Sequence, residues 1–334
     1  MLSTYAYCKK EIVNMNKART IYFYRKYNCF TGGHLKVWDY FNHVKKAGDY
    51  LPFIYLEPGG DVSENNPWRS LTQYQLPEWI PSNADLLFIG GLDWFSLPFP
   101  ERQNWPKPII NLIQGFRHSI PDTPLYDCLS NHAIRICVSQ EVANSILATG
   151  KVNGPVFTIP NGLETKLFPE QKPYHDRTVD ILIVGIKQPD LALKIEQQLC
   201  KLKLDKKIKN LTELIPRKDF LDLLTDSKVT VFLPLDLEGF YLPALEGMAL
   251  KTFVICPDSK GNRSYCIKDD NCLAPIYTLD GIMDSIKSTL IMELSEINNK
   301  LDVANSTINN HNIEIEHQSF LKILNLATNL WKKA

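Results

Sequence analysis

Residues 233 to 251 read LPLDLEGFYLPALEGMALK, and this stretch holds the most informative pattern in the chain. An apolar run ends at Pro234, a short acidic loop carries Glu238, and a helix that opens near Pro243 carries Glu246. The two glutamates are eight positions apart. One lies in the loop before the helix and the other lies just over one turn into it, so both can face the same cleft. This pattern predicts a strand, a loop and a helix that present two carboxylates to a ligand.

The chemistry of this segment suits a nucleotide. Backbone N–H groups at the start of a helix, together with the helix dipole, favour a nearby phosphate. A carboxylate inside the helix offers two acceptor oxygens, which match the two hydroxyl donors of a ribose. A glycine beside the first glutamate lets the backbone approach a ligand closely. The predicted ligand contacts are therefore Glu238, Gly239, Phe240, Tyr241, Leu242 and Glu246.

Strand-like and helix-like runs alternate on both sides of this segment, which is typical of a parallel α/β sheet. The strands predicted in the first half are 20–25, 50–56, 84–90, 108–114, 133–139 and 156–159, with helices at 34–46 and 140–149. The pattern restarts after a polar stretch at 169–178. The elements predicted there are strands 180–184, 229–234 and 252–256 and helices 190–201, 217–226 and 241–250, followed by helix from about 279.

Two successive α/β units predict two Rossmann-like domains that face each other across a ligand-binding cleft. The polar seam places the N-terminal domain at residues 1–170 and the second domain at 171–310. A chain of 334 residues is long enough for two domains of this kind.

Composition excludes several classes of protein. Lys plus Arg and Asp plus Glu are both 37, so the basic excess of a nucleic-acid-binding protein is missing. The eight cysteines form no CxxC pair and suggest reduced thiols, and no His or Cys spacing suggests a zinc site. The N-terminal sequence MLSTYAYCKKEIVN lacks the apolar core of a signal peptide, and no apolar run is long enough to span a membrane. We therefore expect a cytoplasmic protein.

The letters of the glutamate segment, E-GFYLPAL-E, resemble the E-x7-E motif of the group 1 glycosyltransferases (glycosyltransferase family 4), which are retaining enzymes of GT-B fold. Residues 139–163 are similar to the family's segment that ends in IPNG. Residues 217–233 resemble its next helix and strand, and residues 261–273 (GNRSYCIKDDNCL) resemble its following loop. The resemblance covers about residues 130–275, while the N-terminal half agrees in layout more than in letters.

The resemblance implies transfer of a sugar from a nucleoside diphosphate sugar to a hydroxyl, without a bound metal or other cofactor. By it, Glu246 would bind the ribose, and Glu238 would lie near the donor sugar and act in catalysis. Two other interpretations stay open. One is a catalytically silent glycosyltransferase-like subunit that binds a partner, and the other is a GT-B-fold epimerase acting on a nucleotide sugar.

Further candidates lie in the N-terminal half. Gly32 and Gly33 follow the first predicted strand, where paired glycines let a backbone approach the donor. There is no GxGxxG and no Walker A lysine, which argues against a dinucleotide dehydrogenase and a P-loop enzyme. The resemblance implies a histidine past the strand PIINLIQ that contacts the donor sugar, and His118 is our candidate. Arg117 could instead face the acceptor, and His34 is a weaker rival.

The family supplies an arginine and a lysine near the start of the second domain to hold the diphosphate. This sequence departs from that pattern, because it reads VGIKQPD at 184–190 without the expected arginine. Lys187 is the first substitute, Lys194 a weaker one, and Arg263 a third basic candidate. Cationic donors at this place would neutralise the leaving diphosphate.

The resemblance implies a glycan or lipid-linked acceptor, for example in surface polysaccharide biosynthesis. Acceptor specificity would lie in loops of the N-terminal domain, where residues 57–83 carry Trp68, Tyr74 and Trp79. The last segment, 311–334, predicts an amphipathic helix that packs back on the N-terminal domain. Its basic end could instead give peripheral contact with a membrane.

Overall fold

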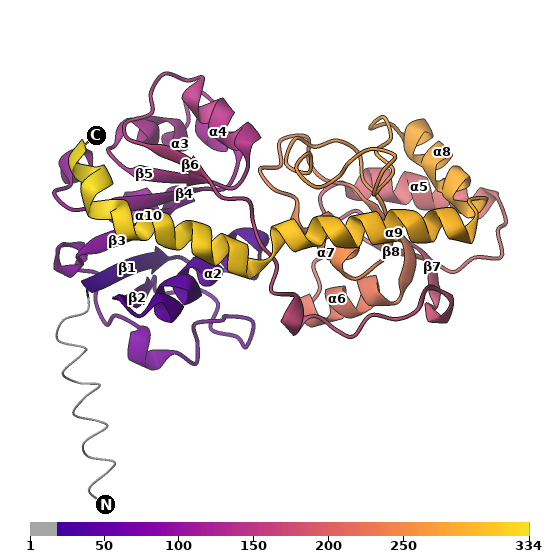
Figure 1. The fold of residues 1–334 in the computed structure, drawn as a ribbon, viewed down its shortest axis with the longest axis horizontal. Helices are drawn as coiled ribbons and strands as arrows, with labels where there is room; N and C mark the ends of the chain where they lie inside the picture. The colour runs from indigo at the N-terminus through magenta and orange to yellow at the C-terminus, as the bar shows by residue number, and fades with distance from the viewer. Residues whose placement is uncertain (1–18, 334) are drawn as a thin grey trace, which may run out of the picture. The chain divides into compact units, whose positions relative to one another are not determined.

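The computed structural model describes residues 19–333, so the prediction about a signal peptide concerns residues outside this range. The chain divides into two compact units (Figure 1). Among the described residues, unit 1 comprises 19–159 and 317–333, and unit 2 is Pro160–Glu316. The division falls eleven residues before the predicted seam at 170/171.

A set of backbone hydrogen bonds explains this position. Leu163 N donates to His311 O at 2.8 Å, and Ile313 N donates to Leu163 O at 3.1 Å. Gly162 N donates to the buried carboxylate of Glu316. The residues just after 160 are therefore held by the last residues of unit 2, a long-range pairing that a local polar pattern does not reveal.

Unit 1 contains a six-stranded parallel sheet in the order β2-β1-β3-β4-β5-β6. The strands are β1 Arg19–Arg25, β2 Tyr50–Leu56, β3 Leu86–Gly90, β4 Ile109–Ile113, β5 Ile134–Cys137 and β6 Val156–Thr158. The central strands are continuous apolar runs because both faces of a parallel sheet are covered. Every strand predicted in this half is confirmed, with ends that differ by one or two residues.

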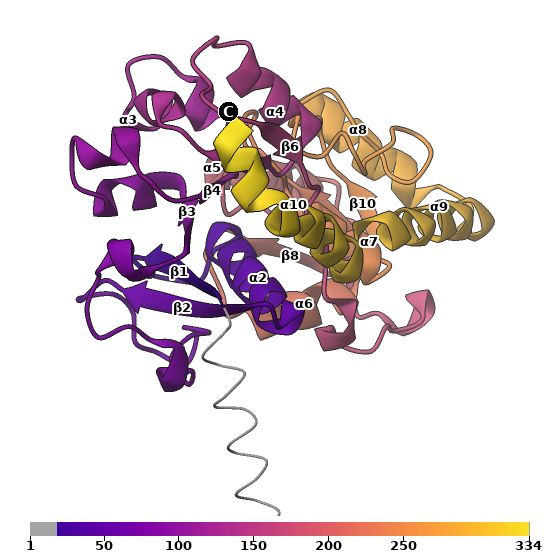
Figure 2. The same cartoon turned by 60° about the vertical axis from the view of Figure 1, so that its left-hand side comes forward.

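Helices α2 (Gly32–Ala47) and α10 (Ile313–Lys333) cover one face of this sheet, and they lie side by side in Figures 1 and 2. Phe23 of β1 packs on Phe41 of α2 at 5.4 Å between ring centroids. Phe320 of α10 meets the edge of Tyr40 at 4.9 Å. One face of α10, with Phe320, Ile323, Leu324 and Ala327, thus belongs to the core of unit 1.

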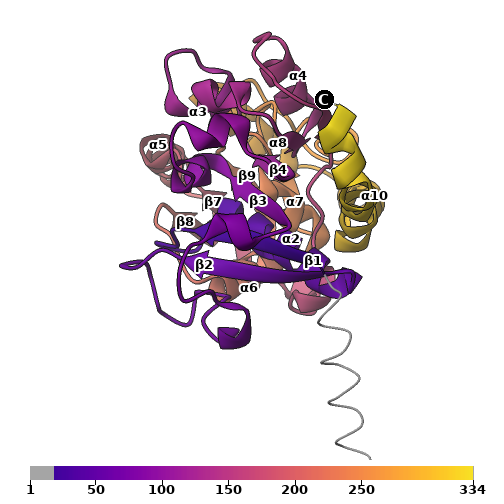
Figure 3. The same ribbon diagram turned by 90° about the vertical axis from the view of Figure 1, so that its left-hand side faces the viewer.

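The opposite face of the unit 1 sheet is covered by short elements (Figure 3). Trp94 and Leu97 pack there on Leu87 and Ile89 of β3. The covering elements include η3 Gly91–Ser96, α3 Pro124–Asp127 and η6 Cys128–Ser130, and α4 Gln140–Leu147 follows β5.

Unit 2 contains a four-stranded parallel sheet in the order β10-β9-β7-β8. The strands are β7 Val179–Val184, β8 Ile208–Leu211, β9 Ser227–Phe232 and β10 Phe253–Ile255. The helices are α5 Pro189–Lys201, α6 Arg217–Thr225, α7 Leu242–Ala249, α8 Leu279–Leu290 and α9 Leu294–Ile308. Side chains of α5, α8 and α9 form one apolar core with the sheet.

Strand β8 was missed by the sequence analysis. It is an edge strand, paired only with β7, and its sequence IKNL follows a lysine-rich turn. Edge strands are partly exposed and tolerate polar residues, so this one lacks the apolar run of its neighbours. The other short helices are η1 Thr72–Tyr74, η2 Pro81–Asn83, η4 Glu101–Asn104, η5 Phe116–Ser119, η7 Thr165–Leu167, η8 Tyr174–Asp176 and η9 Asn309–His311.

Within residues 19–333, no helix is both long and apolar enough to cross a membrane. Over the same residues, no cluster of three or more His, Cys, Asp or Glu side chains is placed to hold a metal ion.

Candidate functional site

The predicted strand, loop and helix around the two glutamates are present in unit 2. Strand β9 ends at Phe232, and α7 begins at Leu242 with Pro243 in its first turn, where the missing N–H costs nothing. Glu246 lies in α7 and is only 2% exposed, whereas Glu238 is partly exposed in the loop. A nearly buried carboxylate requires compensation by charge or hydrogen bonds.

Arg217 provides that charge. Its Nη1 lies 2.7 Å from Oε1 of Glu246. The buried Oε1 has no hydrogen-bond partner among the described residues. The contact with Arg217 is therefore an ion pair that lacks the geometry of a hydrogen bond. The guanidinium also lies 5.9 Å from the centroid of the Phe168 ring. Arg217 therefore compensates and orients the carboxylate, while the hydrogen-bonding capacity of Oε1 is not used by the described residues.

Sequence analysis missed Arg217 as a site residue. It is the first residue of α6, where the helix dipole disfavours a positive charge. A cation at the start of a helix indicates that a nearby negative group stabilises it. This position was the signal in the sequence that could have identified Arg217. Only the fold shows that the group is Glu246.

The second carboxylate, Glu238, pairs with the predicted cation Lys187. Lys187 Nζ donates to Glu238 Oε1, which also accepts from Leu235 N at 3.3 Å. The same ammonium lies 5.5 Å from the centroid of the Tyr241 ring. Lys187 follows β7 in the turn that opens α5. The adjacent Gly185 is required there, since an added Cβ would come within 2.2 Å of Ala192 Cβ.

The loop between the glutamates is fixed by residues that follow β10. Glu238 pairs with Lys260 in an isolated parallel bridge, and Tyr241 N donates to Gly261 O at 3.4 Å. The hydroxyl of Tyr265 donates to Tyr241 O, and burial raises the pKa of that hydroxyl well above its usual value. The loop thus has a defined backbone shape at the start of α7.

Phe240, Tyr241 and Leu242 point their side chains into unit 2, where each is less than a tenth exposed. Phe240 packs near Tyr265, with ring centroids 5.3 Å apart. These three predicted contacts can therefore offer a ligand their backbone rather than their side chains. Gly239 is buried between them and Glu238.

The other basic candidates are placed differently. Arg263 lies in the loop that holds Glu238, but its guanidinium makes two hydrogen bonds to Asp258, one of them Nε–Oδ1 at 2.7 Å. That pairing lowers the pKa of the Asp258 carboxyl. Lys194 is exposed on α5. Of the predicted cations, only Lys187 contacts one of the two glutamates.

In unit 1, the paired glycines open α2 as predicted. Gly32 and Gly33 form its first turn, and the side chain of Thr31 caps the helix by accepting from His34 N at 3.3 Å. Gln114, just past β4, donates from Nε2 to Gly33 O at 3.1 Å. The glycines therefore lie beyond the carboxyl end of β1, where parallel sheets bind ligands.

The structure does not support His118 as a group that faces a ligand. It lies in η5, is 4% exposed, and is covered by unit 1. Burial, and then the charges of Arg135 and Arg117, lower its pKa to about 4. Arg117 itself is exposed on the same turn and remains accessible.

The structure corrects the prediction that Trp68 binds the acceptor, because its side chain is completely buried and presents no face to an acceptor. It packs edge-on against Trp38 and Tyr27 in the core of unit 1. Sequence alone could not separate a stacking tryptophan from a core tryptophan, since both occur in polar loops.

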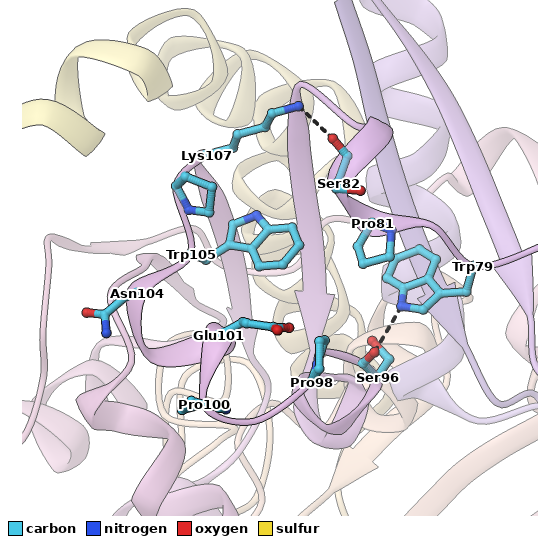
Figure 4. Close-up of a pocket in the computed structure, with 11 residues that line it drawn as sticks. Trp79, Pro81, Ser82, Ser96, Pro98, Pro100, Glu101, Asn104, Trp105 and Lys107 are labelled. Atoms are coloured by element: carbon cyan, nitrogen blue, oxygen red, sulfur yellow. Dashed lines mark hydrogen bonds between the residues drawn. The ribbon is translucent and has the colours of Figure 1, made fainter.

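Trp79, from the same predicted acceptor region, does line a pocket of about 710 Å³ in unit 1 (Figure 4). Trp105 lies across the pocket from Trp79, and Glu101 lies below Trp105 in this view. Trp79 is fixed by its Nε1, which donates to Ser96 O at 3.0 Å. The lining residues are Trp79, Pro81, Ser82, Ser96, Pro98, Pro100, Glu101, Asn104, Trp105, Pro106 and Lys107. Prolines and indoles give this pocket rigid apolar walls.

The family model described as glycosyl transferases group 1 matches residues 165–304, which include both glutamates and their two cations. This stretch of the chain is therefore similar to the group 1 glycosyltransferases. The strand, loop and helix of the glutamates lie inside the matched region. No curated protein sequence matches the chain.

Solved structures extend the comparison beyond residues 165–304. Sucrose-phosphate synthase from Thermosynechococcus elongatus is 13% identical with a TM-score of 0.68, and the match covers 95% of this chain and 100% of that one. A glycosyltransferase from Rickettsia africae is 14% identical with a TM-score of 0.66, over 95% and 100%. HepE from Anabaena, in complex with UDP-glucose, is 13% identical with a TM-score of 0.68, over 92% and 99%. These likenesses confirm the expected GT-B fold across both units.

Proposed function

We propose that the protein transfers a sugar from a nucleoside diphosphate sugar to a hydroxyl of a glycan or lipid-linked acceptor, with retention of configuration and without a metal ion. We place this reaction in the cytoplasm. The match of residues 165–304 to the group 1 glycosyltransferases supports the donor class, as does the UDP-glucose in the complex of HepE. Acceptor, linkage and stereochemistry are inferred from the family resemblance.

The buried carboxylate of Glu246 is the observation that carries this proposal. It pairs with Arg217, and its Oε1 has no hydrogen-bond partner among the described residues. Buried acceptors are satisfied in nearly all proteins, so an open one indicates a missing donor. The two hydroxyls of a ribose are suitable donors, because they can bind both oxygens of one carboxylate. In this proposal Glu246 binds the ribose of the donor nucleotide.

Glu238 and Lys187 supply the charges nearer the reacting carbon. When the bond to the diphosphate breaks, negative charge grows on the leaving group and positive charge grows on the sugar. In this proposal Lys187 neutralises the charge on the leaving group, and Glu238 stabilises the charge on the sugar. Their mutual ion pair keeps both side chains in position before the donor binds.

The test is a panel of nucleotide sugars incubated with the purified chain, with slow donor hydrolysis measured as release of free nucleotide. We expect one donor or a small group of donors to be cleaved. If the chain binds a donor without cleaving it, an acceptor is required. If it neither binds nor cleaves any, the protein is a silent glycosyltransferase-like subunit. Conversion of one nucleotide sugar into another would instead identify an epimerase.

Replacing Lys187 with methionine is expected to weaken donor turnover by about tenfold to 100-fold. The reason is the loss of one charge-assisted contact of about 1.5–3 kcal/mol to the diphosphate. Initial rates of donor hydrolysis measure the effect. Lys194→Met is the matched control, because Lys194 is exposed on α5, the helix that follows Lys187, and contacts neither glutamate. Equal loss in both variants would contradict the assignment to Lys187.

We also propose that the pocket of Trp79 and Trp105 binds part of the acceptor. An indole face suits the apolar face of a sugar ring, and the carboxylate of Glu101 can accept from its hydroxyls. The pocket volume of about 710 Å³ lies within the usual range for small ligands.

Trp105→Ala is expected to abolish binding of labelled protein to its preferred glycans on an oligosaccharide array. Phe99→Ala is the matched control, since Phe99 is an exposed aromatic residue of the same segment outside the pocket. Thermal unfolding of both variants shows whether they are folded. An unchanged array signal for folded Trp105→Ala would rule out this acceptor site.

A further inference from the structure

A buried polar cluster lies at the carboxyl end of β1 in unit 1. Arg25 is the last residue of β1, His34 is the third residue of α2, and Asp93 lies in η3 just after β3. Arg25 Nη1 donates to Asp93 Oδ2 at 2.6 Å, and both side chains are about a tenth exposed. Asp93 also accepts from Gly90 N at 3.2 Å. This ion pair therefore fixes the guanidinium plane.

The same guanidinium holds the imidazole of His34. Its Nε lies 3.3 Å and its Nη2 lies 3.2 Å from Nδ1 of His34. A guanidinium can only donate hydrogen bonds, because every nitrogen carries hydrogen and no lone pair is available. Nδ1 must then be the acceptor. The ring is consequently neutral, and its single proton is on Nε2.

The electrostatic surroundings agree with a neutral ring. Burial lowers the pKa of His34 to about 4, with the positive charge of Arg25 as the second cause. The nearest ring is Tyr27, 4.8 Å away between centroids, and its pKa is raised to about 12, so it too stays neutral. Asp93 faces Arg25 rather than His34. His34 is thus uncharged throughout the physiological pH range.

The position of His34 indicates what its Nε2–H can do. It stands in the first turn of α2 beside Gly33, whose carbonyl is held by Gln114. Over residues 19–333, neither of the recorded hydrogen bonds of the ring uses Nε2. The helix dipole at this end favours an electron-rich ligand. A partly exposed donor at the ligand-binding edge of the sheet can meet an oxygen atom there.

We infer that Arg25 and Asp93 lock His34 as a fixed hydrogen-bond donor, whose Nε2–H binds a hydroxyl or phosphate oxygen of the ligand and does not abstract a proton. The part of the inference that concerns the ligand rests on the proposed function. The part that concerns the tautomer does not depend on it. His34 is then a binding residue, and Arg25 and Asp93 are positioning residues. His34 cannot act as a general base, because Nε2 already carries a proton and the lone pair of Nδ1 accepts from Arg25.

The first experiment is proton–nitrogen correlation NMR of the imidazole rings in the full chain, with His34 assigned by comparison with His34→Gln. We expect Nε2 to be protonated, Nδ1 to be unprotonated, and no titration between about pH 5.5 and 8. In the double variant Arg25→Met, Asp93→Asn, which removes both charges together, the pKa of His34 should rise and the other tautomer should appear. A wild-type ring that titrates in this range, or carries its proton on Nδ1, overturns the inference.

The second experiment measures turnover of the nucleotide sugar that the wild-type chain cleaves. His34→Phe should lower kcat/KM by about tenfold, the usual effect of one hydrogen bond, whereas His34→Gln keeps a donor and should retain most activity. The rate should not fall as the pH drops from 7 to about 5.5, because no base is being protonated. Equal loss in both variants, or a rate that follows protonation of a histidine, contradicts a donor role.

If no nucleotide sugar is cleaved, the proposed function fails, and the two parts of this inference are still decided. The tautomer is read from the free protein. The ligand role is read from the Nε2–H resonance of His34 during titration with inorganic diphosphate. A shift of this resonance supports the inference, and a resonance that does not move counts against it.

Discussion

Glu246→Ala is expected to lower the affinity for the donor nucleotide sugar by about 100-fold or more. In the proposed complex, the carboxylate of Glu246 accepts hydrogen bonds from two hydroxyls of the ribose. Hydrogen bonds to a charged group contribute about 1.5–3 kcal/mol each. Glu246 is 2% exposed, so water cannot replace the lost contacts easily. Binding of the nucleotide sugar, measured by calorimetric titration, gives the change directly.

Two further variants separate this effect from damage to the fold. Glu246→Gln keeps the shape and one acceptor but loses the ion pair with Arg217, so an intermediate loss is expected. Glu296→Ala removes an exposed glutamate of α9 and should bind the donor as the wild type does. Wild-type affinity in a folded Glu246→Ala variant would remove the basis of the proposed function.

Gly261→Ala is expected to reduce donor turnover by about 100-fold and to lower the free energy of unfolding by about 1–3 kcal/mol. An added Cβ would lie 2.3 Å from Glu238 O, whereas ordinary contacts begin at 3.4 Å. The obstructing atoms are backbone, so the loop of Glu238 must move by about an ångström. Displacements of that size at a reacting group have large effects on rate.

Gly115→Ala is the matched control for this substitution. Its backbone is extended, with φ −176°, and no atom lies within 4 Å of an added Cβ. Thermal unfolding and donor hydrolysis should both stay close to wild type. If Gly261→Ala kept full turnover, the fixed shape of the Glu238 loop would have no part in the reaction.

The regular elements of the fold were predictable because their signals are local. Continuous apolar runs marked the buried parallel strands, as in residues 109–113, and Pro243 marked the start of α7. Strand β8 was not predictable in this way, because an edge strand paired on one side needs no apolar run. The seam between the units was also displaced, since Leu163 is held by residues almost 150 positions later in the chain.

The candidate site shows the same division. Glu238 and Glu246 were chosen from the sequence because their spacing and their resemblance to a family motif are visible in the letters. Lys187 was chosen as a substitute for the arginine that the resemblance implies near the start of the second domain. Trp68 was assigned to an acceptor and lies in the core, because exposure depends on what packs against a residue. His118 was chosen over His34, although His118 is buried and His34 stands at the helix start.

The sequence by itself determined the alternation of strands and helices, the motif of two glutamates, and the GT-B fold that this motif implied. These features depend on neighbouring residues or on short spacings. Only the tertiary structure decided that Arg217 faces Glu246 and that Arg25 holds both Asp93 and His34. Each of these contacts joins different elements at the edge of a sheet. The protonation of His34 and the orientation of Glu246 follow from such partners, which the order of residues in the chain does not specify.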